Sequence, residues 1–250
     1  MLFRPCIDLH KGKVKQIVGS TLDTDGLKEN FVAEKSPDWY AELFKSLNLT
    51  GGHVIMLGPG NEDAALCALG AYPGGMSVGG GINETNAENF LRGGASQVIV
   101  TSTLFENGSF SYGRAEALAK AIGPENLIFD LSCISSPSGC MIACDRWRTV
   151  THDSLTPRLL DRLRDYCSEF LVHAVSSEGK RAGADGEVVS VLAEYAAMSG
   201  SVPVTYAGGL GTMDDIRDFM IRTDKKVFFT VGSALDIYGG NLSVKALSEF

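Results

Sequence analysis

Two aspartates in this chain of 250 residues stand where they could transfer protons. Asp8 and Asp130 each come at the end of a short apolar segment, at 5–7 and 127–129. A pair of carboxylates suits proton shuttling, because one can act protonated as a general acid while the other acts ionised as a general base. A single aspartate at a strand end can instead cap a loop. Two at corresponding places favour a role in a functional site.

Two glycine pairs could bind anions. Gly80 and Gly81 leave one strand-like segment and enter a helix-like one, and Gly208 and Gly209 do the same later in the chain. Glycines at such a junction let backbone amides approach an anion that a side chain would push away. One such cluster alone is more often an ordinary loop. The second copy makes anion binding the better interpretation.

A turn that bears hydroxyl groups follows each glycine pair after about twenty residues. The first turn contains Ser102 and Thr103, and the second contains Gly232 and Ser233. Backbone amides, these hydroxyls and the start of a short helix at 233–235 could hold phosphate groups. We therefore expect two anion sites and a ligand with a phosphate at each end.

These features repeat along the chain at nearly constant spacing. The two aspartates are 122 positions apart, and Gly80 and Gly208 are 128 apart. Half the chain is 125 residues. The repeat predicts a duplicated half-barrel within one domain, with halves at about 1–123 and 124–250.

The elements that would position these residues alternate between strand and helix. The expected strands are residues 2–9, 52–57, 76–78, 97–101, 126–131, 169–174, 202–206 and 227–231. The expected helices are residues 37–47, 61–69, 84–91, 112–122, 157–167, 187–198, 212–221 and 242–249. Eight strand–helix units without a break in composition predict an α/β fold, a single-domain (β/α)8 barrel, with a doubly wound open sheet as the alternative.

Two additions to this pattern are expected. Residues 12–19 predict a short ribbon after the first strand, and residues 133–150 predict a hairpin that turns at Ser138 and Gly139. In (β/α)8 barrels the active site lies at the C-terminal ends of the strands. We expect the two aspartates to face each other there across the mouth of the barrel, with one anion site on each flank.

Composition excludes several classes of function. A net charge of -8 argues against a nucleic-acid-binding protein, which would carry a basic face. No apolar run is long enough to span a membrane, and residues 1–5 do not resemble a signal peptide, so we expect a cytoplasmic protein. The six cysteines include no Cys-x-x-Cys pair, and Cys140 and Cys144 with His152 lack the spacing of a structural zinc site. We expect no metal.

The ordered motifs of the chain resemble one enzyme family. They are Pro-Cys-Ile-Asp-Leu-x-x-Gly-Lys-Val at 5–14, Gly-His-Val-Ile-Met-Leu-Gly at 52–58, Val-Gly-Gly-Gly-Ile-Asn at 78–83, Asp-Leu-Ser-Cys at 130–133 and Tyr-Ala-Gly-Gly at 206–209. Together they look like the phosphoribosylformimino-aminoimidazole-carboxamide ribotide isomerases of histidine biosynthesis, in their eukaryotic form. The resemblance covers nearly the whole chain.

The resemblance implies an Amadori rearrangement of an aminoaldose to an aminoketose in a bisphosphate substrate, without a metal or an organic cofactor. By position it implies Asp8 as the base and Asp130 as the acid. It also implies that Trp147 packs on the heterocycle of the substrate and that His53 contacts the substrate. Structural roles remain open for both, since Trp147 could anchor the hairpin and His53 could be a buried polar residue of the core.

The chain departs from bacterial members of the family at two positions. Ala174 stands where they carry a threonine, and Asn83 stands where an arginine is common. Ser176 and Ser177 are possible substitutes for the missing hydroxyl.

Two other functions compete with the isomerase. The sibling cyclase of the same pathway shares the doubled barrel, both phosphate sites and both aspartates, but it needs ammonia from a glutaminase, and we expect no such domain in this chain. A barrel that only binds a bisphosphate is the other rival, although a binder of an anion gains nothing from two nearby carboxylates. We expect a small-molecule substrate and no obligate protein partner.

Overall fold

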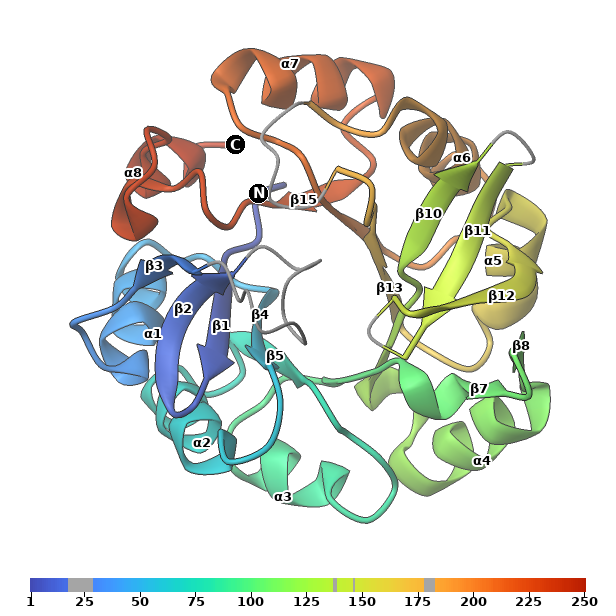
Figure 1. Cartoon of the computed structure of the whole chain (residues 1–250), viewed down its shortest axis with the longest axis horizontal. Coiled ribbons are helices and arrows are strands. Elements are labelled where there is room, and N and C mark those ends of the chain that lie inside the picture. Colours follow the sequence, from blue (N-terminus) through green and yellow to red (C-terminus); the bar gives the residue numbers. More distant parts are fainter. Residues whose placement is uncertain (18–28, 137–138, 146, 178–182) are drawn as a thin grey trace. The chain divides into compact units, whose positions relative to one another are not determined.

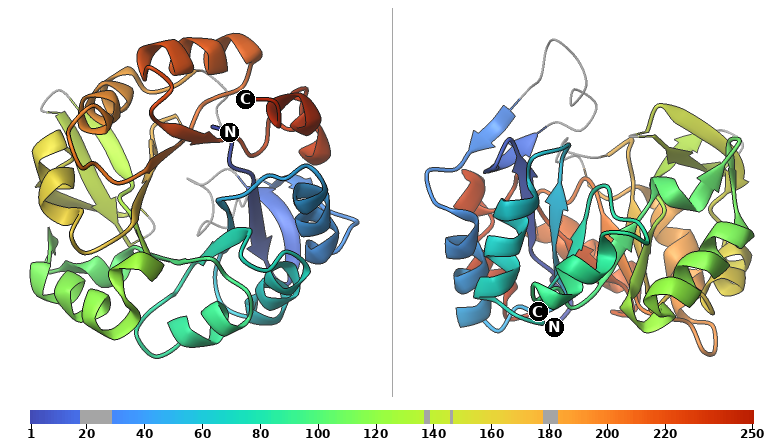
Figure 2. Two further views of the ribbon diagram at one scale, coloured as in Figure 1. Left: turned by 180° about the vertical axis from the view of Figure 1, so that it is seen from behind. Right: turned by 90° about the horizontal axis from the view of Figure 1, so that it is seen from below.

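The computed structural model describes residues 1–17, 29–136, 139–145, 147–177 and 183–250. The chain divides into two compact units. The first unit contains residues 1, 3–99 and 230–250, and the second contains residues 2 and 100–229. Strands and helices alternate along the chain within each unit, as the colours of Figures 1 and 2 show.

Parallel strands form the centre of the first unit. They are β1 (Cys6–His10), β4 (Gly52–Met56), β5 (Met76–Gly79) and the first two residues of β6 (Val98–Val100). The strands lie in the order β6-β5-β4-β1, and Asp8 of β1 pairs with Ile55 of β4. This register brings the C-terminal ends of β1 and β4 to the same edge of the sheet, and Asp8 lies two residues before the end of β1.

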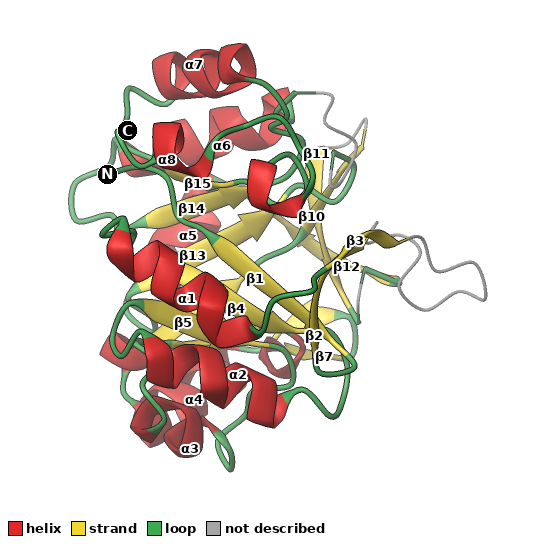
Figure 3. Ribbon diagram, turned by 90° about the vertical axis from the view of Figure 1, so that its left-hand side faces the viewer, coloured by secondary structure: helices red, strands yellow, loops and turns green. Residues whose placement is uncertain are grey.

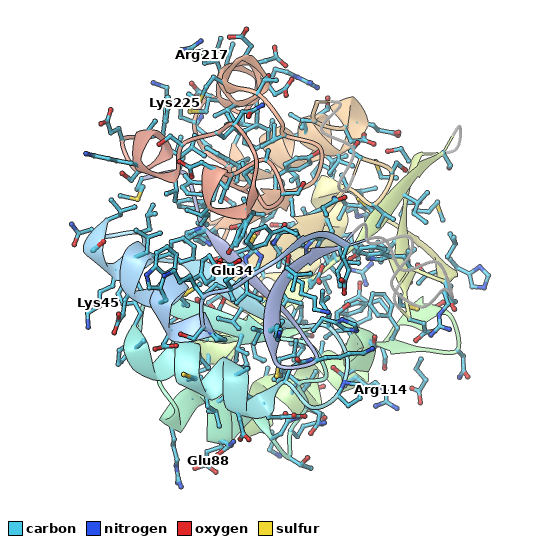
Figure 4. All side chains as sticks on the ribbon, turned by 60° about the vertical axis from the view of Figure 1, so that its left-hand side comes forward. Glu34, Lys45, Glu88, Arg114, Arg217 and Lys225 are labelled. Carbon is cyan, nitrogen blue, oxygen red and sulfur yellow. The ribbon has the colours of Figure 1, made fainter. Side chains whose placement is uncertain are left out.

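The helices of the first unit cover the outer face of these strands. They are α1 (Pro37–Ser46), α2 (Glu62–Ala71), α3 (Ala87–Arg92), the 3₁₀ turn η4 (Asp236–Tyr238) and α8 (Val244–Leu247). Figure 3 shows α1 and α2 side by side along β1 and β4. Pro37 occupies the first turn of α1 after Ser36, as predicted from its fixed φ. The exposed side chains of Lys45 and Glu88 lie on these helices, away from the strands (Figure 4).

An antiparallel ribbon extends the sheet of the first unit beyond β1. It consists of β2 (Lys13–Ile17) and β3 (Glu29–Val32), with Leu9 paired to Val14. The predicted ribbon is confirmed over β2, and residues 18–19 lie outside the described part of the chain. The Nζ of Lys15 lies 2.6 Å from the Oε1 of Glu29 and joins the two strands. The sequence did not predict β3, because its residues are mostly exposed and do not alternate.

The second unit repeats the parallel arrangement. Its strands are β9 (Leu127–Asp130), β13 (Glu169–His173), β14 (Val204–Ala207) and the first two residues of β15 (Phe228–Thr230). They lie in the order β15-β14-β13-β9. Asp130 pairs with Leu171 of β13. The helices are α4 (Tyr112–Ile122), the 3₁₀ turn η3 (Pro124–Asn126), α5 (Pro157–Leu163), α6 (Gly186–Ala196) and α7 (Met213–Arg222).

Aromatic side chains fill the core of the second unit. Phe129, Phe170 and Tyr195 form a continuous row, with ring centroids 6.5 and 5.7 Å apart. All three side chains are fully buried. Edge-to-face and tilted contacts of this kind add to the free energy gained from burying the rings. The row holds α6 against β13 and β9, and therefore supports the strand that ends in Asp130.

The insertion after β9 is larger than predicted. β10 (Cys133–Ser136) and β11 (Gly139–Cys144) form the expected hairpin, and β12 (Thr149–Ser154) adds a third antiparallel strand. Of the two predicted turn residues, Ser138 lies outside the described residues, and Gly139 begins β11. Figure 1 shows the three strands side by side. The third strand was missed because Val150 is half exposed and the segment otherwise consists of polar residues.

Three helices are shorter than their apolar patterns predicted. The predicted helix at 84–91 begins only at Ala87, because the side chains of Asn83 and Asn86 bond to backbone groups of the preceding turn. Asparagine often competes with a helix in this way. The helix predicted at 157–167 ends at Leu163, and the one predicted at 242–249 spans Val244–Leu247. A small hairpin of β7 (Phe105–Glu106) and β8 (Ser109–Phe110) was not predicted.

All six cysteines lie in described residues and are free thiols. Cys67 on α2 is exposed, and the other five are buried. Burial raises the pKa of Cys167 well above its usual value. Such thiols behave as small apolar residues of the core.

The capping box of α7 provides a test of local stability. Thr212 Oγ1 accepts a hydrogen bond from the backbone N–H of Asp215, and the carboxylate of Asp215 accepts one from the N–H of Thr212. We expect Thr212→Ala to lower the free energy of unfolding by about 1 kcal/mol. Thr212→Ser keeps the hydroxyl acceptor and should lose much less. Urea denaturation of both variants measures the difference, and equal losses would contradict the capping role.

Candidate active site

In the first unit, Asp8 is held by an amide. The Oδ2 of Asp8 accepts a hydrogen bond from the Nε2 of Gln16, at 3.0 Å. Gln16 lies on β2 and is 4% exposed. A hydrogen bond donated to a carboxylate favours its ionised form. Gln16 was not predicted as a site residue, because only the antiparallel pairing of β2 with β1 brings it to Asp8.

His53 lies deeper in the first unit than Asp8. It is the second residue of β4, is 5% exposed, and pairs with Cys6 of β1 and Ser77 of β5. Asp8 pairs with Ile55, two residues further along β4. His53 therefore precedes the strand end at which Asp8 is placed, and its contact with substrate stays a prediction.

The first glycine pair combines one crowded and one open position. Gly80 has a φ of 96°, and a side chain there would collide with the backbone carbonyl of Met56. Gly81 has a φ of 76°, and a Cβ atom there would meet nothing within 4 Å. The carbonyl of Gly81 accepts a hydrogen bond from the Nδ2 of Asn86, at 3.0 Å. Gly80 thus allows the close approach of β4, whereas Gly81 leaves free space next to its backbone.

The C-terminal segment of the first unit lies against β1. Tyr238 donates a hydrogen bond from its hydroxyl to the carbonyl of Cys6, at 2.5 Å, and burial holds the pKa of Tyr238 well above its usual value. The Sγ of Cys6 donates to the carbonyl of Val231, at 3.6 Å. The predicted binding residues Gly232 and Ser233 follow directly, and both are half-buried.

In the second unit, Asp130 has two side-chain partners. Its Oδ1 lies 3.1 Å from the Nδ1 of His173 and accepts a hydrogen bond from the Oγ of Ser132, at 3.3 Å. The side chains of Asp130 and His173 are 12% and 17% exposed. His173 ends β13, two residues beyond the partner of Asp130 in the sheet. Asp130 therefore has a neighbour that can itself exchange a proton near neutral pH.

The turn that contains Ser102 and Thr103 belongs to the second unit, and one of its hydroxyl groups has no hydrogen-bond partner within the described residues. Ser102 and Thr103 form the 3₁₀ turn η2 (Ser102–Leu104). Within the described residues, the buried Oγ1 of Thr103 has no hydrogen-bond partner. A buried polar atom without a partner is costly, so a ligand that supplied one would be stabilised there.

The second glycine pair is crowded at both positions. A side chain at Gly208 would meet the carbonyl of Ala174 at 2.8 Å, and one at Gly209 would collide with the carbonyl of Gly183. The N–H of Gly183 donates to the carbonyl of Gly209, at 3.0 Å. Ala174, one of the two departures from the bacterial pattern, therefore packs against Gly208. The Cβ atom of Ser177 lies 2.9 Å from the position that a Cβ atom on residue 209 would take.

Trp147 lies in the turn between β11 and β12. Its φ of 67° is left-handed, which is uncommon for a tryptophan, and its side chain is half-buried. The predicted role of Trp147 stays a prediction.

The predicted residues are distributed over both units. Asp8, His53, Gly80, Gly81, Gly232 and Ser233 belong to the first unit, and Asp130, Ser102, Thr103, Trp147, Gly208 and Gly209 belong to the second. Each predicted anion site draws residues from both units, and its assembly stays a prediction.

Within the described ranges, no group of three or more His, Cys, Asp or Glu side chains could hold a metal ion. None of the helices in the described part of the chain is long and apolar enough to cross a membrane.

Comparison with known proteins points to one enzyme. A model of the family described as histidine biosynthesis protein matches residues 3–243. A relative from Medicago truncatula is 48% identical over 251 residues, covering 97% of this chain and 79% of the relative. It is named as a chloroplastic 1-(5-phosphoribosyl)-5-((5-phosphoribosylamino)methylideneamino) imidazole-4-carboxamide isomerase.

Fungal relatives carry the same enzyme name without a compartment. The one from Neurospora crassa is 45% identical over 243 residues, which cover 95% of this chain and 93% of the relative. The one from Saccharomyces cerevisiae is 43% identical over 245 residues, which cover 96% and 94%.

The unequal crowding at Gly80 and Gly81 predicts unequal effects of substitution. Both Gly80→Ala and Gly81→Ala place a side chain on a left-handed backbone, at a cost of about 1–2 kcal/mol. Gly80→Ala also forces the new methyl group against Met56, which adds roughly 1–3 kcal/mol. We expect urea denaturation to show a clearly larger loss for Gly80→Ala. If Gly81→Ala lowered the free energy of unfolding as much as Gly80→Ala does, the conclusion that the space beside Gly81 is open would be contradicted.

Proposed function

The chain belongs to the histidine biosynthesis protein family, and we propose that Asp8 and Asp130 carry out the isomerase reaction for which its relatives are named. The fold class is α/β, of the (β/α)8 barrel type typical of this family. The protein is an aldose–ketose isomerase of histidine biosynthesis, which converts phosphoribosylformimino-aminoimidazole-carboxamide ribotide to its phosphoribulosyl isomer. The roles of individual residues in that reaction are proposed below.

The different partners of the two aspartates support different roles. Gln16 donates to Asp8 through an amide, which does not titrate and favours an ionised carboxylate. Asp8 is therefore proposed as the base. Asp130 also accepts a hydrogen bond, from Ser132, but it differs from Asp8 in lying beside the imidazole of His173, a group that can deliver or accept a proton. Asp130 is therefore proposed as the acid.

The reaction requires one proton donation and one proton abstraction. Asp130 protonates the furanose ring oxygen of the aminoaldose, and the bond between C1 and that oxygen breaks to leave a Schiff base at C1. Asp8 then removes the proton from C2, and the electron pair forms a C1–C2 double bond. The resulting enolamine tautomerises to the ketone at C2 and the amine at C1. The substrate is oxidised at C2 and reduced at C1, so no external oxidant is needed.

The substrate is proposed to be held at its two phosphate ends. The names of the relatives contain two 5-phosphoribosyl groups. One phosphate is assigned to Gly80, Gly81, Ser102 and Thr103, and the other to Gly208, Gly209, Gly232 and Ser233. The open backbone at Gly81 and the unpartnered Oγ1 of Thr103 support the first assignment. His53 and Trp147 are proposed to contact the rest of the substrate.

Turnover of the aminoaldose ribotide tests the function directly. The purified protein should change the absorbance of this substrate with no ammonia and no glutaminase present. The sibling cyclase would need ammonia, and a barrel that only binds the bisphosphate would show no change. The relatives are named as isomerases, and neither alternative is favoured by them.

The cellular setting is proposed to be the cytoplasm, without an obligate protein partner. The Medicago relative is named as chloroplastic, so the location differs within the family. A fluorescent fusion in the source cells tests the location. Full activity of the purified chain alone tests the absence of a required partner.

The proposed acid and base predict the effect of removing either carboxylate. Asp8→Asn and Asp130→Asn should each lower kcat by roughly a hundred- to ten-thousand-fold, which is the usual range for general acid–base catalysis. KM should change little, because the phosphate contacts remain. The double variant should be scarcely worse than the poorer single one, since the two groups act in one reaction.

Steady-state kinetics on the three variants measure these effects. Asp63→Asn on the exposed start of α2 serves as the matched control and should keep wild-type kcat. Near-normal turnover in Asp8→Asn would remove the proposed base.

A further inference from the structure

We propose that Gln16 positions Asp8 for catalysis, and that position 232 is a glycine because the amide of Gln16 occupies the space that a side chain would need. This inference rests on the proposed function of Asp8 as the base. It joins the base to one of the two predicted phosphate sites through a single side chain. Every residue in the argument belongs to the first unit.

The nitrogen end of the Gln16 side chain is hydrogen-bonded to Asp8. The Nε2 group donates to the Oδ2 of Asp8 at 3.0 Å, and the residue is 4% exposed. A buried amide without partners would be destabilising, so this bond fixes the side chain as well as the carboxylate. The backbone of Asp8 is already held in β1 by its pairing with β4. The strand pairing does not fix the rotation of the Asp8 carboxylate, and the bond from Gln16 restricts that rotation.

The other end of the Gln16 side chain lies against Gly232. A Cβ atom built at position 232 would be 2.5 Å from the Oε1 of Gln16 and 3.6 Å from the Sγ of Cys6. Real contacts are not this short, so a methyl group at 232 would have to displace the amide. The backbone of Gly232 does not have the positive φ that would favour glycine. Its backbone would accept an alanine, and the need for glycine comes from the space that Gln16 fills.

The position of residue 232 relative to β1 is set by two hydrogen bonds. The Sγ of Cys6 donates to the carbonyl of Val231, and the hydroxyl of Tyr238 donates to the carbonyl of Cys6. The backbone on both sides of the contact is therefore held in place. The Oε1 of Gln16 is the end of a flexible side chain, so it is the atom that would move. A methyl group at 232 would push the amide and weaken its bond to Asp8.

This geometry predicts that a change in the phosphate turn acts on the chemical step. Gln16→Ala should lower kcat by about ten- to a hundred-fold, since misplacement of a catalytic group by about 1 Å can cost a hundred-fold. Gly232→Ala should lower kcat to a similar extent. A glycine that served only to grip phosphate would instead raise KM and leave kcat nearly unchanged.

The double variant shows whether Gly232→Ala lowers kcat through Gln16 or independently of it. In Gln16→Ala the space beside residue 232 is empty, so adding Gly232→Ala should cause no further loss of kcat. The kcat of the double variant should equal that of Gln16→Ala, a strongly non-additive cycle. Losses that multiply would overturn the inference, as would a normal kcat in Gln16→Ala.

Two further variants protect the test against misfolding. Gly70→Ala on α2 is the matched glycine control, because a Cβ there meets nothing within 4 Å, and it should keep wild-type kinetics. Gln16→Met keeps the bulk of the side chain but removes the amide, and it should lose kcat as Gln16→Ala does. If Gly232→Ala does not fold, normal kcat in a folded Gln16→Met still overturns the inference.

Turnover by the wild-type protein shows whether a failed test counts against the proposed function or only against the role of Gln16. If the wild-type protein does not turn over the aminoaldose ribotide, the proposed function fails. If the wild type is active and the cycle is additive, the function stands and only the role of Gln16 and Gly232 is overturned.

Discussion

The close approach of two parallel backbones at a strand-end glycine is the constraint on which both units depend. In the first unit Gly80 lies against the carbonyl of Met56, and in the second Gly208 lies against the carbonyl of Ala174. Both glycines have a positive φ, which turns the chain sharply as it leaves the strand. A side chain at either position would separate neighbouring strands. Two glycines 128 residues apart therefore allow the same kind of close packing, as the predicted internal repeat implies.

The repeat preserves the carboxylates but not the groups around them. Asp8 has the amide of Gln16 as its partner, whereas Asp130 has the imidazole of His173 and the hydroxyl of Ser132. A neutral amide stabilises a fixed charge, and an imidazole can share a proton. Two equivalent aspartates can therefore be given unlike roles by unlike neighbours. Divergence between the halves has fallen on the partners of the two aspartates, while both aspartates lie on parallel strands.

The elements with strong local signals were predictable from the sequence. The apolar strands, the proline at the start of α1 and the glycines after β5 and β14 depend on short-range patterns, and they lie where predicted. The contact between Gln16 and Asp8 could not be predicted, because it depends on how β2 turns back along β1. The contact of His173 with Asp130 likewise depends on pairing between strands 43 residues apart in the chain. Local patterns indicate which residues end a strand, but only the register between strands decides their neighbours.

The distribution of thiols makes the folded chain selective toward alkylating reagents. Cys67 is exposed on α2, while the other five cysteines are buried. Burial and the nearby Asp38 also raise the pKa of Cys67, so its accessibility to a reagent, and not its acidity, distinguishes it from the five buried thiols. A maleimide dye therefore attaches at one place, on the outer surface of a helix. Unfolding exposes five more thiols, so the stoichiometry of labelling counts how much of the population has lost its native packing.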